Sequence, residues 1–171
     1  MTETLFVSQG WADATPRLSV LIPFLRDDPC DLLGLLEREA ADLAGHVAVV
    51  LLDDGTADPG LTRRLHGLIG SMTLPVQLIT MSDNLGRSKG RNRLAAAARG
   101  DFLLFLDSDM RPDTPNFLGR WLAEVVERQP AVVFGGFSLL QAPTDDRFKV
   151  HRAIATRSEC LDAAARNHEP E

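Results

Sequence analysis

The residues Gly-Asp-Phe-Leu-Leu-Phe-Leu-Asp-Ser-Asp-Met-Arg-Pro-Asp, at positions 100–113, predict the element around which the fold is organised. Residues 102–106 form a continuous apolar run that is too short for a buried helix, with a glycine before it and a proline after it. Such a run predicts a strand that is covered on both faces. Asp107 and Asp109 follow at once, where their oxygens can converge on one hard cation or on hydroxyl groups.

An Asp-x-Asp pair is weak evidence by itself, because Asp and Ser are also common in solvated turns. Two interpretations of Asp107 and Asp109 therefore stay open at this point, an ordinary turn and a binding site. The case for a binding site depends on which residues follow the other predicted strands.

The rest of the chain repeats one pattern, a short apolar run followed by a stretch with helical spacing of its apolar residues. The predicted strands lie at residues 18–24, 46–52, 76–80, 102–106 and 131–137. The predicted helices fill the gaps, at residues 28–45, 58–70, 87–99 and 114–130. Strands that alternate with helices are typical of right-handed βαβ crossovers, so the predicted fold class is α/β with a mostly parallel central sheet.

Three segments are expected. Residues 1–16 show no sustained period and predict a loosely attached lead-in, whereas residues 17–140 predict the α/β domain. Residues 141–171 predict a polar segment with a helix within 147–166 whose apolar stripe is thin. A segment this polar is expected to need a partner that the chain itself does not supply.

Composition narrows the class of protein. The 171 residues, 44% of them apolar, are enough for one sizeable core, and a net charge of −6 argues against a broad nucleic-acid footprint. Two distant cysteines and the lack of a signal-peptide pattern predict a reduced compartment, the cytoplasm. No apolar run is long enough to span a bilayer.

Polar residues follow each of the first four predicted strands. In open α/β sheets, ligands bind outside the carboxyl ends of the strands, so we expect one cleft to gather these residues. In chain order they are Arg26, Asp27 and Asp28 after Pro23; then Asp53, Asp54, Gly55 and Thr56; then Asp83, Asn84, Leu85 and Gly86; and finally Asp107, Ser108 and Asp109.

Two of these groups have competing interpretations. Residues 53–56 form either a solvated turn or a tight glycine turn whose carboxylate accepts the N–H of a base or ribose hydroxyls. The helix that follows residue 86 starts with four cations, Arg87, Lys89, Arg91 and Arg93. Cations at a helix start oppose the macrodipole, which favours an anionic ligand there over simple solvation. No P-loop and no Gly-x-Gly-x-x-Gly is present, which excludes a typical NTPase and a Rossmann dehydrogenase.

In order and spacing, these motifs resemble those of the inverting glycosyltransferases of family 2, which have the GT-A fold, a Rossmann-like three-layer sandwich. The matching motifs are Val20-Leu21-Ile22-Pro23, Asp53-Asp54-Gly55-Thr56, Asn84-Leu85-Gly86 with Arg91-Asn92, residues 100–109, and Gly135-Gly136. Gly90 stands where the family often has Ala, and Met110 where a third Asp is common. Neither departure removes a group that the chemistry requires.

The resemblance implies a nucleotide-sugar donor site made of Pro23, Asp53, Asp54, Arg91, Asp107 and Ser108. It implies that Asp53 or Asp54 reads the base or ribose, that Arg91 lies near the diphosphate, and that Asp107 and Asp109 serve ribose and metal. The metal would be Mn²⁺ or Mg²⁺, bridging Asp109 to the diphosphate.

The resemblance also implies a reaction, the transfer of a sugar to a hydroxyl of a carbohydrate or lipid-linked acceptor, in the cytoplasm or at the inner face of the membrane. This chain would be the donor-binding half, with the catalytic base expected beyond residue 171. Two alternatives stay open: a nucleotide-binding or assembly module without turnover, and a sugar-phosphate nucleotidyltransferase. The second would be expected to carry a glycine-rich phosphate loop after the first strand, and residues 23–26 do not provide one.

Overall fold

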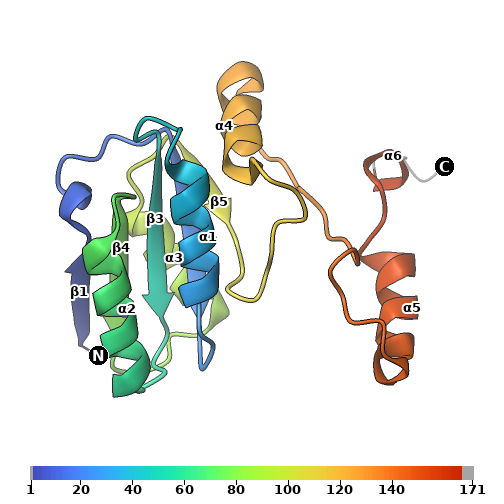
Figure 1. Cartoon of the computed structure of the whole chain (residues 1–171), viewed down its shortest axis with the longest axis horizontal. Coiled ribbons are helices and arrows are strands. Elements are labelled where there is room, and N and C mark those ends of the chain that lie inside the picture. Colours follow the sequence, from blue (N-terminus) through green and yellow to red (C-terminus); the bar gives the residue numbers. More distant parts are fainter. Residues whose placement is uncertain (1, 167–171) are drawn as a thin grey trace. The chain divides into compact units, whose positions relative to one another are not determined.

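The computed structural model describes residues 2–166 and contains two compact units (Figure 1). The first unit is made of residues 1–110 and 115–128, and the second of residues 111–114 and 129–171. The first holds all the strands that the structure describes. The limits expected for the α/β domain, residues 17 and 140, remain predictions.

The first unit contains the predicted alternation of strands and helices. Its elements are β1 (Glu3–Val7), β2 (Leu18–Phe24), α1 (Cys30–Ala40), β3 (Val47–Asp53), α2 (Pro59–Ser71), β4 (Val76–Met81), α3 (Arg87–Ala97), β5 (Phe102–Phe105) and α4 (Phe117–Arg128). The sheet order is β1-β4-β3-β2-β5, and β2 to β5 run parallel. The predicted α/β class with a mostly parallel sheet is therefore confirmed.

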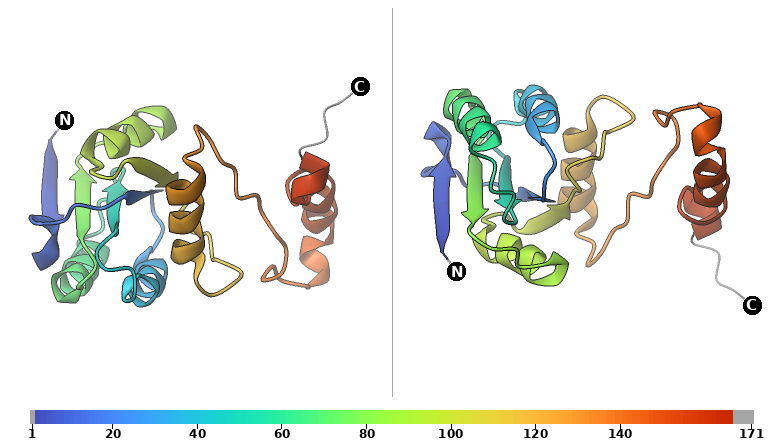
Figure 2. Two further views of the ribbon diagram at one scale, coloured as in Figure 1. Left: turned by 90° about the horizontal axis from the view of Figure 1, so that it is seen from above. Right: turned by 90° about the horizontal axis from the view of Figure 1, so that it is seen from below.

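The sheet buries apolar side chains on both faces, because successive residues of a strand point to opposite sides. One face packs Val20, Val49 and Leu51 against α1, α2 and Leu118 of α4. The other face packs Leu21 and similar residues against α3. Figure 2 shows α3 on one side of the sheet and α1 with α2 on the other. This two-sided cover is why β2 and β3 are almost entirely apolar, with only Ser19 in β2 and Asp53 at the end of β3 as exceptions.

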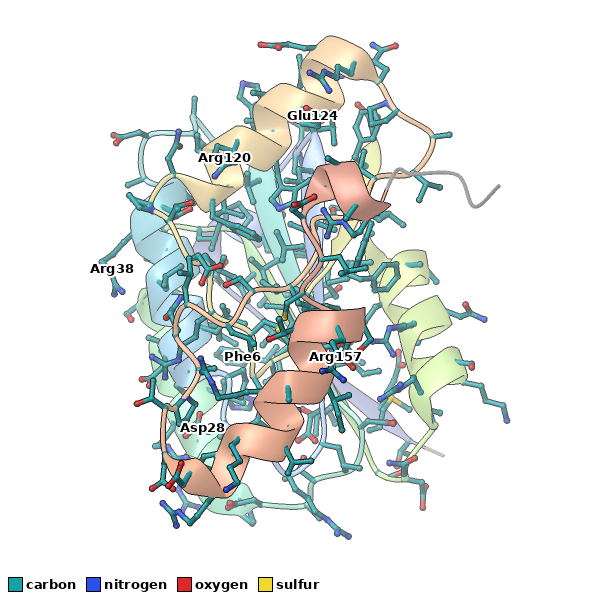
Figure 3. All side chains as sticks on the ribbon, turned by 90° about the vertical axis from the view of Figure 1, so that its right-hand side faces the viewer. Phe6, Asp28, Arg38, Arg120, Glu124 and Arg157 are labelled. Carbon is teal, nitrogen blue, oxygen red and sulfur yellow. The ribbon has the colours of Figure 1, made fainter. Side chains whose placement is uncertain are left out.

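Helix α4 joins the first unit through α1. Glu39 Oε2 accepts a hydrogen bond of 2.8 Å from the Leu118 backbone N–H, which satisfies one of the free amides of the first turn. Leu118 and Val125 are buried, whereas charged residues such as Arg120 and Glu124 lie one turn apart on the same helix (Figure 3). The helix that was predicted to start at Thr114 starts three residues later, at Phe117.

The prediction that residues 1–16 are loosely attached was wrong. Strand β1 pairs antiparallel with β4 along its whole length. Glu3 accepts two hydrogen bonds of 2.8 Å from the Arg93 guanidinium, and the Arg99 guanidinium lies 4.6 Å from the centre of the buried Trp11 ring. This edge strand is held mainly by backbone pairing and by cations from distant residues. Its apolar residues therefore need not follow a regular spacing that the sequence would reveal.

Two expectations for the last strands also failed. Residues 131–137 form no strand, although they are rich in β-branched and aromatic residues. Strand β5 is an edge strand, and Leu103 and Phe105 on one of its faces are 44% and 43% exposed. It is therefore covered on one face, not on both. A short apolar run of this kind looks the same in an edge strand and in a central strand, so the sequence could not show that β5 lies at the edge.

The second unit contains short helices, η2 (Asp146–Phe148), α5 (Lys149–Ser158) and α6 (Ala163–Arg166). The helix expected within residues 147–166 is thus present but interrupted after Ser158. Many apolar side chains of this unit are exposed, among them Val132, Leu140 and Ile154. Within residues 2–166, no helix is both long enough and apolar enough to cross a membrane.

Candidate functional site

Asp54, directly after β3, fastens the loop between β4 and α3. Its Oδ1 accepts a hydrogen bond of 2.6 Å from the Leu85 N–H, and its Oδ2 accepts one of 3.1 Å from the Gly86 N–H. The residue is buried, and both of its oxygens are engaged by backbone amides. Asp54 therefore stabilises the loop at residues 85–86, which distinguishes it from the neighbouring Asp53.

Asp53 is also buried and organises the turn that follows β3. Its Oδ1 accepts a hydrogen bond of 2.8 Å from the Thr56 N–H. Gly55 has φ of +87°, and a Cβ there would lie 3.0 Å from the Asn84 backbone nitrogen, so only glycine suits this position. Thr56 Oγ1 in turn accepts the Arg26 N–H at 2.9 Å. The turn thus connects the ends of β2, β3 and β4.

Helix α3 approaches the sheet closely at Gly90. A Cβ on Gly90 would lie 3.1 Å from Leu52 Cδ2 of β3, which is tighter than ordinary packing. Gly86, with φ of +79°, precedes the helix as its N-cap residue. The absence of a Cβ at residue 90, one of the two departures noted in the sequence, therefore lets α3 pack directly on β3.

The four cations at the start of α3 have different surroundings. Arg91 Nη2 lies 2.7 Å from Asp107 Oδ1, and the two side chains are 31% and 48% exposed. Arg93 belongs to the Glu3 ion pair that holds β1, whereas Arg87 and Lys89 are exposed. Of the four, Arg91 is the one that the structure brings to the acidic residues after β5.

The acidic segment after β5 is held at Ser108 as well as at Asp107. Ser108 Oγ donates a hydrogen bond of 2.6 Å to Asp27 Oδ2, from the loop that follows β2. The Asp107 carbonyl accepts the Met110 N–H at 3.1 Å, which closes a turn around the segment. Asp109 is exposed, and Pro23 is partly buried in β2 opposite Leu52.

Asp28 faces away from this group, contrary to the expectation that all these polar residues converge. Its Oδ1 accepts the Cys30 N–H at 3.0 Å, and its Oδ2 lies 2.6 Å from Arg64 Nη2 of α2. Hydrogen bonds from Cys30 and then from Arg64 hold the pKa of Asp28 below its usual value, whereas burial, with Asp28 beside it, raises the pKa of the Cys30 thiol to about 11. Asp28 therefore stabilises the start of α1.

The residues available for a metal are Asp107 and Asp109. Residues 2–166 contain no group of three or more His, Cys, Asp or Glu side chains placed to hold an ion. Mg²⁺ and comparable hard ions often use one or two protein carboxylates and take their other ligands from water and substrate phosphates. An exposed Asp109 beside a half-exposed Asp107 fits such an ion.

Sequence reasoning did not identify the partners of these residues. The Asp27–Ser108 hydrogen bond joins residues 81 positions apart, and the Arg93–Glu3 pair joins residues 90 positions apart. Because Asp27 follows a predicted strand, the sequence indicated that it lies at the edge of the sheet where ligands bind. No local signal identified Ser108 as its partner.

The sequence profile described as glycosyl transferase family 2 matches residues 19–169. An N-acetylglucosaminyltransferase of Bradyrhizobium elkanii is 32% identical over 95 residues, which are 55% of this chain and 52% of the relative. The human polypeptide N-acetylgalactosaminyltransferase 13 is 28% identical over 143 residues, 81% of this chain and 25% of the relative. The chain thus spans about half or less of the length of these relatives.

Solved structures show the same fold. The solved structure of residues 1–349 of TarS from S. aureus matches with a TM-score of 0.53 and 24% identity, over 66% of this chain and 33% of that one. The mannosyltransferase PcManGT from Pyrobaculum calidifontis, solved in complex with GDP-Man and Mn²⁺, matches with a TM-score of 0.52 and 20% identity, over 64% and 32% of the two chains. The GT-A type of fold predicted from the sequence is therefore confirmed.

Proposed function

Because the chain belongs to glycosyl transferase family 2, we propose that it binds a nucleotide-diphosphate sugar and takes part in transferring that sugar to an acceptor hydroxyl. The observation that carries this proposal is the pairing of Arg91 with Asp107 beside the exposed Asp109, at the carboxyl end of the parallel sheet. A cation and two acids at this edge suit a diphosphate with its metal.

We assign a role to each residue of the proposed site from its position, its exposure and, where it has them, its contacts. Arg91 would bind the diphosphate, Asp109 would hold Mn²⁺ or Mg²⁺, and Asp107 would serve the metal and the ribose. Asp53 reads the base or ribose, because both oxygens of Asp54 are engaged by Leu85 and Gly86. Asp54, Pro23 and Ser108 shape the walls of this site.

The proposed reaction makes one bond and breaks one. The acceptor oxygen bonds to the anomeric carbon from the opposite face, with inversion, while the bond from that carbon to the diphosphate oxygen breaks. The electron pair stays on the nucleoside diphosphate, and the acceptor proton passes to a base, which we expect beyond residue 171. A bound divalent cation supplies electrostatic stabilisation of the charge that develops on the diphosphate. Arg91 adds a fixed positive charge beside it.

The names of the relatives favour an N-acetylhexosamine donor carried by UDP. The B. elkanii relative is an N-acetylglucosaminyltransferase, the human one an N-acetylgalactosaminyltransferase, and TarS has been solved with UDP-GlcNAc. UDP-GlcNAc and UDP are therefore the first ligands to test. We expect the acceptor to be a carbohydrate or a lipid-linked molecule, and the protein to act in the cytoplasm or at the inner face of the membrane.

Calorimetry tests this proposal directly. We expect UDP and UDP-GlcNAc to bind more tightly with Mn²⁺ than without it, and GDP-mannose to bind more weakly than UDP-GlcNAc. Arg91→Ala should weaken UDP far more than uridine, because uridine lacks the diphosphate. Absence of Mn²⁺-dependent binding by every nucleoside diphosphate would contradict the proposal.

A working transferase also differs from a binding module without turnover. General-base assistance is worth roughly a hundred- to ten-thousand-fold in rate. We therefore expect this chain to bind the donor but to transfer the sugar poorly, and a longer chain that carries the base to transfer it faster by such a factor. Equal rates for both chains would place the base within residues 1–171.

A further inference from the structure

Ser108 stands between the two acids of the proposed metal site, and its hydroxyl points to a residue outside the motif. The hydroxyl donates a hydrogen bond of 2.6 Å to Asp27 Oδ2, and both residues are partly buried. A short hydrogen bond to an ionised carboxylate is among the stronger polar contacts in proteins. It fixes the middle of the Asp107-Ser108-Asp109 segment from the neighbouring strand.

Asp27 is itself held in place by its loop. Arg26, one residue before it, has φ of +58°, a conformation that costs energy for any residue other than glycine. The loop keeps this conformation because the Arg26 N–H donates to Thr56 Oγ1 at 2.9 Å and the Phe24 carbonyl accepts the Asp54 N–H at 3.0 Å. The ends of β2 and β3 therefore fix the direction of the Asp27 carboxylate.

The acidic segment thus has one support on each side. Arg91 from α3 holds Asp107, and Asp27 from the β2–α1 loop holds Ser108. Asp27 does not join Asp107 and Asp109 in a group that could hold an ion, since the described part of the chain contains no group of three such residues. Its effect on a metal would therefore pass through Ser108.

We propose that Asp27 is a positioning residue that orients the Asp107–Asp109 carboxylates toward a metal–diphosphate ligand through its hydrogen bond to Ser108. This inference rests on the proposed donor-binding function and adds a residue to it. Without the hydrogen bond, the segment that carries Asp107 and Asp109 loses the restraint at Ser108. The metal would then be bound in many geometries, of which few also suit the diphosphate.

The test is the factor by which Mn²⁺ increases UDP affinity, measured by calorimetry for the wild type, four variants of Asp27 and Ser108, and one control variant. Asp27→Ala and Ser108→Ala each remove the hydrogen bond and should each reduce this factor about tenfold, a typical loss for a charge-assisted hydrogen bond. The double variant should lose no more than either single variant, because both changes remove the same contact. Asp27→Asn keeps an acceptor oxygen and should stay within about threefold of the wild type.

Asp28→Ala is the matched control. It removes the adjacent carboxylate, which contacts Cys30 and Arg64, and should leave the Mn²⁺ effect unchanged. Additive losses in the double variant, or an equal loss in Asp27→Asn and Asp27→Ala, would show that Asp27 binds the ligand directly and would overturn the positioning role. A wild-type Mn²⁺ effect that survives in Asp27→Ala would overturn it as well.

The same experiment separates the two proposals. A wild-type protein that shows no Mn²⁺-dependent binding of UDP or of any other nucleoside diphosphate contradicts the proposed function. A wild-type protein with a clear Mn²⁺ effect that Asp27→Ala and Ser108→Ala retain contradicts the role of Asp27 alone. Melting curves of all variants, expected within a few degrees of the wild type, exclude loss of the fold as the cause.

Discussion

The two compact units of the chain differ in how completely they bury their apolar side chains. In the first unit, residues of the central strands such as Leu51 are fully buried, and the buried acids Asp53 and Asp54 accept backbone hydrogen bonds. In the second unit, Val132 is 89% exposed and Leu140 is 81% exposed. The first unit therefore supplies its own core, whereas the folding energy of the second depends little on its apolar residues.

The polar residues of the proposed site follow the same division. Asp53, Arg91, Asp107 and Asp109 all belong to the first unit. Asp53 accepts a backbone hydrogen bond from Thr56, Asp107 pairs with the Arg91 side chain, and Ser108, next to Asp109, donates to the Asp27 side chain. A site whose residues must keep fixed directions needs such a rigid frame. We therefore expect the stability of the fold and the proposed donor binding both to depend on the first unit.

Truncation of one leucine in each unit should give the largest difference. Leu51→Ala leaves a cavity in the centre of the sheet and should lower the free energy of unfolding by about 2–5 kcal/mol. Leu140→Ala removes a side chain that is already in water and should change it by less than about 0.5 kcal/mol. Urea denaturation followed by circular dichroism measures both. Similar losses for the two variants would contradict the contrast between the units.

Substitution of two glycines should distinguish a tightly packed position from an open one within the first unit. A Cβ at Gly100 would lie 2.7 Å from the Ser19 backbone nitrogen, so Gly100→Ala must displace β2 or β5 and should cost about 1–3 kcal/mol. Gly67 lies in α2 with nothing within 4 Å of its Cβ position, so Gly67→Ala should stabilise the protein by up to about 1 kcal/mol. Thermal melts should move in opposite directions. A neutral Gly100→Ala would show that the close contact is absent in solution.

The smallest expected effect is the pH dependence of the Glu3–Arg93 ion pair. The hydrogen bond from Arg93 lowers the pKa of Glu3 below its ordinary value of 4.5. A lowered pKa in the folded state contributes stability that is present above 4.5 and is lost as the pH falls through the folded value. Glu3→Gln should therefore cost about 0.2–1 kcal/mol at pH 7, as exposed pairs do, and nothing near pH 2.

A matched pair in the second unit provides the control for this prediction. The hydrogen bond from Arg147 lowers the pKa of Asp145, but these residues are two positions apart and join no distant elements. Asp145→Asn should leave the melting temperature of the first unit unchanged at any pH. A Glu3→Gln penalty that persists at low pH would mean that packing of the side chain, and not its charge, holds β1.

Much of this organisation was predictable from local sequence. The strands from Leu18 to Phe105 and their helices follow from short apolar runs, glycines and N-terminal caps such as Asp58, whose Oδ1 accepts the Gly60 and Leu61 N–H groups. Residues 3–7 were missed and residues 131–137 were wrongly predicted as a strand. Pairing at a sheet edge depends on partners far away in the chain, which a local pattern does not contain.

The candidate site shows the same limit. The position of Asp53, Asp54, Asp107 and Asp109 after strands follows from the sequence, because parallel strands end at one edge of the sheet. The different roles of Asp53 and Asp54 could not be predicted from the sequence, because they depend on which backbone N–H groups lie near each carboxylate. The support of Ser108 by Asp27 likewise appears only when the loops are folded together.

The most direct test of the account compares Asp109→Asn with Asp107→Asn in Mn²⁺ titrations with and without UDP, read by calorimetry and by the paramagnetic relaxation of water. Asp109 is exposed and is proposed to hold the metal, so Asp109→Asn should abolish the increase in UDP affinity that Mn²⁺ causes, with the melting temperature nearly unchanged. Asp107 also holds Arg91 at 2.7 Å, so Asp107→Asn should weaken UDP binding both with and without Mn²⁺. If Asp109→Asn keeps the wild-type Mn²⁺ effect, the two acids form a solvated turn and the donor-site assignment is wrong.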